Sequence, residues 1–283
     1  MHSVVCIKQV PDSAQIRVHP VTNTIMRQGV PTIINPYDLF ALEEALRLRD
    51  RFGGRVTVMT MGPPMAETAL RKALAYGADA AVLMTDRVFA GSDTLATSFV
   101  LASGIARIAA EHPVDIVFAG KQTIDGDTAQ VGPGIASRMK LNQLTYIERI
   151  AELDLGLGQI VVHRRAEGGV QVLATRLPSL VTMLEGANEI RYASMDDMFR
   201  AARAEITTWS ATDAGIEDVG KCGLRGSPTV VRKVFAPTPR TEKAKAIDVA
   251  DKSPVEIADA VIKTLLTANP KLRHDLFRQA RAG

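Results

Sequence analysis

The sequence predicts an α/β fold: a doubly wound parallel sheet with helices on both faces, followed by an extended C-terminal arm and short helices. Up to residue 142, short apolar runs alternate with amphipathic helical segments. The apolar runs are continuous, as in strands of a parallel sheet that are buried on both faces. The long loop Gly120–Pro133 follows one such run and opens a helical segment. Ligands of such sheets bind beyond the carboxyl ends of the strands, where this loop lies.

The predicted elements follow one another at regular intervals. The apolar strands are Val4–Gln9, Val56–Met61, Ala81–Met84 and Asp115–Ala119. The helices between and after them are Tyr37–Arg51, Pro64–Tyr76, Asp93–Ala110 and Ala129–Leu141. The first helix has leucine and alanine at helical spacing and stops at Gly53-Gly54. The second helix stops at Gly77. These alternating units predict a parallel sheet covered by helices on both faces.

The character of the chain changes near residue 142. Three strands are predicted at Thr145–Leu153, Gln159–Arg164 and Val170–Thr175, the last two joined by a turn at Glu167-Gly168-Gly169. We assign residues 1–204 to the nucleotide-binding domain and residues 205–283 to an arm that wraps a partner. The arm shows no periodicity over 205–250, and a segment that cannot form its own core usually folds against a partner. Its helices are expected at Pro254–Thr267 and Lys271–Arg281.

Composition narrows the class of protein. The chain has 283 residues, 46% of them hydrophobic, which is enough for a sizeable core. Its 34 basic and 31 acidic residues give a formal charge of +3, which argues against a nucleic-acid binder. No run of 18 apolar residues occurs, so no direct membrane insertion is expected. The start of the chain reads as a buried strand and not a signal peptide, which predicts a cytoplasmic protein.

Metal and thiol chemistry are also disfavoured. Cys6 and Cys222 are more than two hundred positions apart, and the five histidines lack the spacing of metal ligands. The sequence also lacks a G-x-G-x-x-G motif after the first strand, a P-loop and a G-x-S-x-G elbow. We therefore predict no catalytic residue and no metal. Any redox chemistry belongs to an organic cofactor.

The loop Gly120–Pro133 is the strongest candidate for a ligand site. A loop that opens a helix presents backbone N–H groups and the positive end of the helix dipole to an anion. Gly120, Gly126, Gly132 and Gly134 would permit close approach of a ligand or a positive φ. Asp127 and Thr128 are predicted to cap the helix. The alternative is a well-capped turn without a ligand, and acids such as Asp125 more often cap backbone or hold ribose than catalyse.

Three further loops are expected beside it. Cys6-Ile7-Lys8 ends the first strand, Asn35–Asp38 opens the first helix, and Met61-Gly62 ends the second strand. Asn35 should cap the first helix, whose first residue would be Pro36. Met61 is either a core residue or a neighbour of an adenine. A stand-alone ATP-dependent enzyme is disfavoured because Lys8–Asp12 stands where such enzymes carry a glycine- and serine-rich loop.

These loops, in this order, resemble the β subunit of electron-transfer flavoproteins. The resemblance rests on the segments VVCIKQVPD, INPYDLFALEEAL, VTVMTMGPP, ALAYGADAAVLMTDR, AGKQTIDGDTAQVGP and NEIRYASM. It implies a heterodimer with an α subunit that carries an FAD, and an adenine nucleotide held by this chain. The residues expected to contact the nucleotide are Cys6, Lys8, Asn35, Pro36, Tyr37, Asp38, Met61, Gly62, Asp93, Thr94, Thr97, Gly120, Asp125, Gly126, Asp127, Thr128, Ala129, Gln130, Val131, Gly132, Pro133, Gly134, Ile135 and Ala136.

The resemblance also bears on which nucleotide is bound. Ordinary members hold AMP in this site, and electron-bifurcating members hold a second FAD. The stretch Asp86–Ser98 looks like the bifurcating type, and with Lys221–Val231 is most similar to the nitrogen-fixation-associated (Fix-type) group. Asp93, Thr94 and Thr97 would lie on one face of a helical turn and could hydrogen-bond a flavin. The alternative is an ordinary N-cap by Ser92 or Asp93. We expect FAD, with AMP as the alternative.

The Fix-type resemblance implies a set of redox partners. NADH would be the donor, ferredoxin or flavodoxin the low-potential acceptor, and a quinone-linked oxidoreductase the acceptor beyond the α-subunit FAD. Residues 188–200 resemble the recognition loop of the family, with Tyr192 and Met195 facing a partner and Met195 at the anchor position. Arg165 and Arg225 are basic candidates for tuning a flavin, with a surface salt bridge as the alternative for each.

Overall fold

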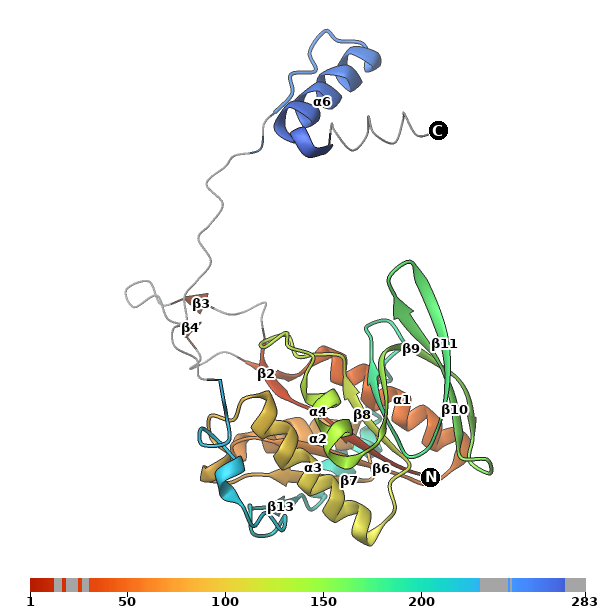
Figure 1. The fold of residues 1–283 in the computed structure, drawn as a ribbon, viewed down its shortest axis with the longest axis vertical. Coiled ribbons are helices and arrows are strands. Elements are labelled where there is room, and N and C mark those ends of the chain that lie inside the picture. The colour runs from red at the N-terminus through yellow and green to blue at the C-terminus, as the bar shows by residue number, and fades with distance from the viewer. Residues whose placement is uncertain (13–16, 19–24, 27–30, 230–243, 245, 273–283) are drawn as a thin grey trace. The chain divides into compact units, whose positions relative to one another are not determined.

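The computed structural model describes residues 1–12, 17–18, 25–26, 31–229, 244 and 246–272. The chain forms two compact units, Met1–Ala236 and Pro237–Gly283 (Figure 1). This boundary lies later than the predicted one at residue 204. The reason is that strand β13 (Thr207–Trp209) pairs with β7 of the main sheet, and Ala211, Ala214 and Cys222 are buried. The predicted arm therefore begins with a segment that belongs to the first unit.

A nine-stranded sheet forms the centre of the first unit. Its strand order is β11-β10-β9-β12-β8-β1-β6-β7-β13. The strands are β1 (His2–Cys6), β6 (Arg55–Met61), β7 (Ala80–Met84), β8 (Ile116–Gly120), β9 (Asn142–Asp154), β10 (Gln159–Ala166), β11 (Gly169–Arg176) and β12 (Ser179–Met183), with β13 at one edge. Only the β9–β10 and β10–β11 pairs are antiparallel. The predicted strands are all present, and the parallel-dominated sheet is confirmed; β12 and β13 were not predicted.

Helices cover both faces of the sheet, as predicted (Figure 1). Residues of α1 (Pro36–Phe52) and α2 (Glu67–Ala75) share one buried cluster with the sheet. Residues of α3 (Thr94–Glu111) and α4 (Val131–Met139) belong to the other. The remaining helix of the first unit is α5 (Met195–Arg203), which contacts α2. Short 3₁₀ turns occur at η2 (Pro64–Ala66), η3 (Arg87–Phe89) and η4 (Val219–Lys221).

Two local departures from the predicted elements have a backbone cause. Helix α4 begins at Val131 and not at Ala129, because Asp127 and Ala129 adopt left-handed φ values of 52° and 55°. Strand β9 carries an irregularity at Tyr146, whose φ is 60°. There the pairing with β12 shifts register between Val181 and Met183. Such bulges re-aim side chains at the rims of sheets.

Small strand pairs and the second unit complete the described chain. β2 (Gln9–Pro11) pairs with β5 (Thr32–Ile34), and β3 (Arg17–Val18) with β4 (Ile25–Met26). Helix α6 (Pro254–Ala268) starts with a capping box made by Ser253 and Glu256. This confirms the helix predicted at Pro254–Thr267. The predicted helix Lys271–Arg281 lies almost wholly outside the described residues, as do residues 230–243 of the arm.

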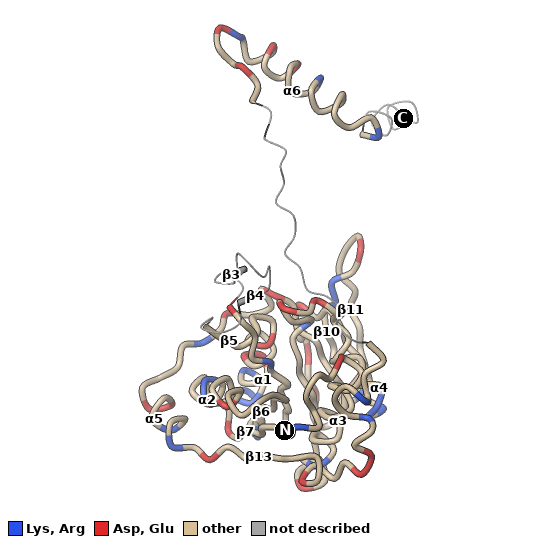
Figure 2. The backbone as a smooth tube through the Cα atoms, turned by 90° about the vertical axis from the view of Figure 1, so that its left-hand side faces the viewer, with Lys and Arg blue, Asp and Glu red and all other residues tan. Residues whose placement is uncertain are grey.

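The described residues lack membrane-spanning helices and clusters of metal ligands. They contain no helix that is long and apolar enough to cross a membrane. They also contain no group of three or more histidine, cysteine, aspartate or glutamate side chains placed to hold a metal ion. Acidic and basic residues are interspersed over the first unit in Figure 2.

Candidate functional site

The four predicted loops meet at the carboxyl edge of the parallel strands. Asn35, fully buried, ties the start of α1 to the loop after β8. Its Nδ2 donates to the Gln122 carbonyl at 2.8 Å, and its Oδ1 accepts from the Ile124 N–H at 3.1 Å. Pro36 is the first residue of α1, as predicted. The predicted side-chain cap by Asn35 is wrong, because both polar atoms of this amide are used on the neighbouring loop.

Asp38, in the first turn of α1, links the ends of strands β1 and β8. Its buried carboxylate accepts the N–H of Lys8 at 2.7 Å and the N–H of Gly120 at 3.1 Å. Burial raises the pKa of Asp38 to about 7, against the effect of these donors. Burial, with the nearby Asp38 charge, raises the pKa of the Cys6 thiol to about 12. Cys6 is therefore a protonated, buried side chain, and Asp38 holds the β1 and β8 loops in register.

The charged side chains at this edge are partly paired. The Lys8 ammonium contacts both carboxylate oxygens of Asp125, at 2.8 and 2.9 Å. Burial opposes the charge on Asp125, but the hydrogen bonds from Lys8 and Thr123 outweigh it and lower the pKa of the carboxyl. The Lys121 ammonium lies 5.0 Å from the centre of the Tyr37 ring. The edge thus presents two lysines, one neutralised by a carboxylate and one over an aromatic face.

The start of α4 presents backbone donors. The N-cap residue is Gln130, whose side chain makes no capping hydrogen bond. The predicted caps Asp127 and Thr128 are wrong, because the left-handed backbone at Asp127 turns its carboxylate to the Gln122 amide, 2.8 Å away. Within the described part of the chain, the N–H groups of residues 128–132 make no hydrogen bond. Ala129 is left-handed and Gln130, which follows it, is right-handed, and such a pair turns neighbouring N–H groups toward one anion-binding concavity.

The glycines of this loop serve packing within the protein. A Cβ on Gly120 would collide with Asp38 and Tyr37. One on Gly132 would lie 2.8 Å from Thr182 Cγ2, and one on Gly134 2.7 Å from Ser98. None of these glycines has a positive φ. The predicted positive φ at these glycines is therefore wrong, and the left-handed positions are Asp127 and Ala129.

Other predicted contact residues lie deeper. Ile135 and Ala136 are buried in the α3–α4 core, where they anchor α4 against the sheet. Met61 packs against the same core at the end of β6, and the Gly62 N–H donates to the Met84 carbonyl. Pro133 lies in the first turn of α4, partly buried. These residues hold the edge in place. The exposed residues of the site are Lys8, residues 125–128 and Gln130.

The start of α3 lies beside the start of α4. The Thr94 hydroxyl donates to Gln130 Oε1 at 2.8 Å, which links the two helix starts. Asp93 is the N-cap of α3: its Oδ1 accepts the N–H groups of Leu95 and Ala96. Its Oδ2 accepts the backbone N–H and the hydroxyl of Thr229. Thr97, three residues after Thr94, is partly buried. The N-cap alternative for Asp93 is confirmed.

The segment that holds this turn was not predicted to pack there. Ser227 Oγ accepts the Asp93 N–H at 2.8 Å and donates to the Gly223 carbonyl at 2.7 Å. The Gly223 N–H donates to Ser92 Oγ at 3.0 Å. Residues 222–229 therefore clamp the α3 start. A long, aperiodic glycine-rich segment carries no pattern that indicates where it packs.

A second exposed feature surrounds the start of α5. Tyr192 is 97% exposed and Met195, the first residue of α5, is 66% exposed. Met198 and Phe199 extend this apolar surface along one face of the helix. Ser194 caps the helix by accepting the Asp197 N–H. Both residues predicted to face a partner are thus at the surface.

Buried acids on α1 position this segment, and they were missed in the sequence. Glu43 accepts hydrogen bonds from Arg191 Nε at 2.8 Å and from Arg191 Nη2 at 3.1 Å. Asn188 donates to Glu44 and to the Phe40 carbonyl. The hydrogen bonds that Arg191 donates to Glu43 raise the pKa of its guanidinium despite burial. Adjacent glutamates on the buried face of a helix are the signal that would have indicated them.

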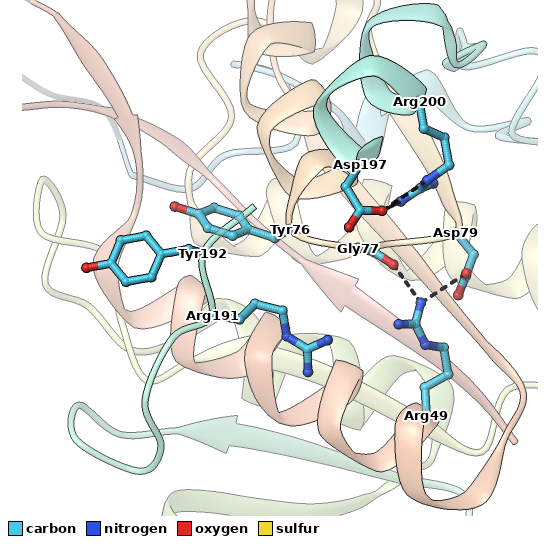
Figure 3. A pocket seen from close by; sticks show the side chains of 8 residues that line it. All are labelled: Arg49, Tyr76, Gly77, Asp79, Arg191, Tyr192, Asp197 and Arg200. Carbon is cyan, nitrogen blue, oxygen red and sulfur yellow. Dashed lines mark hydrogen bonds and ion pairs between the residues drawn. The ribbon is translucent and has the colours of Figure 1, made fainter. Parts of the chain in front are cut away.

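A pocket lies beside this segment, away from the strand ends. Figure 3 shows it between the end of α1, the α2–β7 connection and α5, with Tyr76 and Tyr192 on one side. Its arginines are already engaged: Arg49 with Asp79 and the Gly77 carbonyl, and Arg200 with Asp197. The pocket therefore has little free positive charge. Arg165, elsewhere on the surface, pairs with Glu148 and Glu185, in line with the salt-bridge alternative.

The fold is that of an α/β protein with a parallel-dominated sheet and a donor-rich loop at the carboxyl edge of its strands. Residues 22–214 match the electron transfer flavoprotein domain, and the chain belongs to that family. It is 66% identical to Protein FixA of Sinorhizobium fredii over 98% of this chain and 97% of the relative. It is 63% identical to Protein FixA of Azotobacter vinelandii, over 99% and 100% of the two chains. With the electron transfer flavoprotein subunit beta of Clostridium acetobutylicum it shares 48% identity, over 94% and 98%. The predicted family resemblance is confirmed.

Proposed function

We propose that this chain is the β subunit of a heterodimeric electron-transfer flavoprotein that binds FAD and bifurcates electrons. The donor would be NADH, and the acceptors would be ferredoxin or flavodoxin and, through the α-subunit FAD, a quinone-linked oxidoreductase. The observation that carries the proposal is the row of N–H groups at residues 128–132, which have no hydrogen-bond partner among the described residues and lie next to the Thr94–Gln130 contact. The relatives named for nitrogen fixation and for an electron-transfer β subunit support it.

The exposed part of the site fits a nucleotide diphosphate. Five backbone donors at a helix start favour phosphate oxygens, because an anion both accepts their hydrogen bonds and opposes the helix dipole. The acids Asp125 and Asp127 stand on the same loop, where ribose hydroxyls would find acceptors. FAD, when bound, would supply the one- and two-electron chemistry. The chain's own residues bind and orient it, and none is proposed to be catalytic.

The choice of FAD over AMP rests on the contact between the α3 and α4 starts. AMP would need only the loop at residues 125–132. The polar groups of Thr94 and Thr97, on the adjoining turn, extend the surface toward a larger ligand. One observation favours AMP instead: Asp93 has both oxygens occupied by the chain's own donors. The structural role of that residue is complete without a flavin.

Counting nucleotides distinguishes these candidates. The chain is co-purified with its α partner, and the cofactors are extracted and quantified. Two FAD molecules per heterodimer are expected. One FAD and one AMP would contradict bifurcation but keep an electron-transfer flavoprotein with a structural AMP. Turnover of ATP by the isolated chain would contradict both.

A matched pair of variants tests the placement of the site. Asp127→Gly keeps the left-handed conformation available, whereas Asp127→Val strongly disfavours it because the side chain is β-branched. Asp127→Val should therefore release the nucleotide of this chain, and Asp127→Gly should retain it. Equal nucleotide content in the two variants would place the ligand elsewhere.

A further inference from the structure

The outer surface at the start of α3 combines exposed apolar side chains with unpaired cations. Val88, Leu95 and Leu224 are 39%, 49% and 62% exposed. Leu224 lies close to Gly91, since a Cβ there would be 2.7 Å from its side chain, and the Gly223 backbone packs on the Val88 carbonyl. Leu95 lies in the first turn of α3, whose N-cap Asp93 is held by the same segment through Ser227. We call this group, with the exposed Arg87, Arg138 and Arg225, the α3 entry surface.

The arginines of this surface have exposed guanidinium groups that form no ion pair within the part of the chain that the structure describes. Among the described residues, Arg87, Arg138 and Arg225 have no carboxylate partner. Arg138 is oriented by the Leu95 carbonyl at 3.0 Å and by Ser98 Oγ at 3.1 Å. Its guanidinium lies 5.5 Å from the centre of the Phe99 ring. It is therefore fixed beside Leu95 while its charge stays available.

The aspartates in the same region contact groups other than these three arginines. Asp86 accepts the N–H groups of Val88 and Ala211. Asp93 is saturated by the α3 N-terminus and Thr229. Asp218 pairs with Lys221 at 3.4 Å. The α3 entry surface is thus a small apolar centre with a basic rim.

We propose that the α3 entry surface docks a small acidic electron-carrier protein. This rests on the proposed function, since the Thr94–Gln130 contact puts the surface next to the site assigned to the flavin. An apolar centre of three side chains suits the small interfaces of transient electron-transfer encounters. The rim of guanidiniums complements carboxylates around the redox centre of such a carrier and would steer its approach.

The experiment uses the purified heterodimer with its cofactors and a bacterial flavodoxin as the probe. Binding is measured by calorimetry at low and high ionic strength. The variants are Arg87→Glu combined with Arg225→Glu, and separately Leu224→Ser. The control is Arg176→Glu, at an exposed arginine on β11 at the opposite edge of the sheet that has no ion pair with any residue the structure describes. Cofactor content and circular dichroism check that each variant is folded.

At low salt the double reversal should raise the flavodoxin Kd about tenfold, and high salt should remove most of that difference. Leu224→Ser should weaken binding at both ionic strengths, and Arg176→Glu should change little. The proposal is overturned if wild type does not bind flavodoxin, or if the control weakens binding as much as the reversal does. It is also overturned if the reversal releases the α subunit, because the α subunit would then be the occupant.

The flavin count of the same preparations tests the proposed function separately. One FAD and one AMP, with the binding pattern intact, would refute bifurcation and leave the docking surface standing. Two FAD molecules with unchanged flavodoxin binding in every variant would refute the docking surface alone.

Discussion

Gly132, in the first turn of α4, offers a sharp test of the packing beneath the candidate site. A Cβ at this position would lie 2.8 Å from Thr182 Cγ2, well inside the contact distance of about 3.5–4.0 Å between carbon atoms. Leu180, at 3.5 Å, is in ordinary contact. Gly132→Ala should therefore force α4 away from β12. Overpacking of this kind costs about 1–3 kcal/mol, partly offset by alanine's helix propensity of up to about 1 kcal/mol.

The second substitution isolates the clash. Thr182→Ser removes the offending methyl but keeps the oxygen that accepts the Tyr146 N–H at 3.2 Å. Thr182 is buried, so the lost methyl alone should cost about 0.8 kcal/mol. In the serine background, Gly132→Ala should be neutral or stabilising. The double-mutant cycle should then show a coupling free energy of about 1–2 kcal/mol.

The assay is urea unfolding of wild type, both single variants and the double variant, with nucleotide content measured in parallel. Gly126→Ala is the control, because its Cβ meets only Thr123 Oγ1 at 3.2 Å and the position is exposed. It should change stability by less than about 0.5 kcal/mol. If Gly132→Ala is as stable as wild type, or if Thr182→Ser gives no rescue, the packing explanation of this glycine is wrong.

Three further predictions concern other parts of the first unit. Burial raises the pKa of Asp38 to about 7, above its unfolded value of about 4, so its contribution to stability is fully present below pH 4 and is lost as the pH rises through 7. In Asp38→Asn the unfolding midpoint should change less with pH over that range. If it changes with pH as much as in wild type, another group titrates. Glu43→Gln breaks the buried ion pair with Arg191, so it should lower stability by about 1–3 kcal/mol. Amide hydrogen exchange at residues 188–192 should become faster. Exchange rates equal to those of wild type would show that other contacts hold the segment. Met195→Glu should slow electron transfer to the quinone-linked partner with cofactor content unchanged, and loss of flavin would mean that the loop is structural.

Local patterns were sufficient to predict most of the main sheet. The strands β1, β6, β7 and β8 are continuous apolar runs, and such runs are buried on both faces wherever they occur in a parallel sheet. The hairpin between β10 and β11 was predicted from its Gly168-Gly169 turn. By contrast β13 has only three residues, and its place beside β7 is decided by contacts across more than a hundred positions.

The sequence predicted which loops form the candidate site, but the structure corrected the roles of individual residues in them. The order of strands and loops indicated which segments would meet at the carboxyl edge, because parallel strands end at one side of a sheet. The roles of Asn35 and Asp127 were mistaken, since short polar side chains next to a helix are usual caps. Here each finds a partner on a loop that lies beside it only after folding.

The sequence by itself determined the fold class, the family and the set of loops at the ligand edge, because these depend on apolar periodicity and on short motifs. The tertiary structure alone decided what individual residues do there. It assigned Gly132 and Gly134 to internal packing, the left-handed backbone to Asp127 and Ala129, and the clamp on Asp93 to Thr229. The physical reason is that steric contacts and hydrogen bonds act over a few ångströms. Which groups come that close is fixed by how distant segments pack, and no local pattern records it.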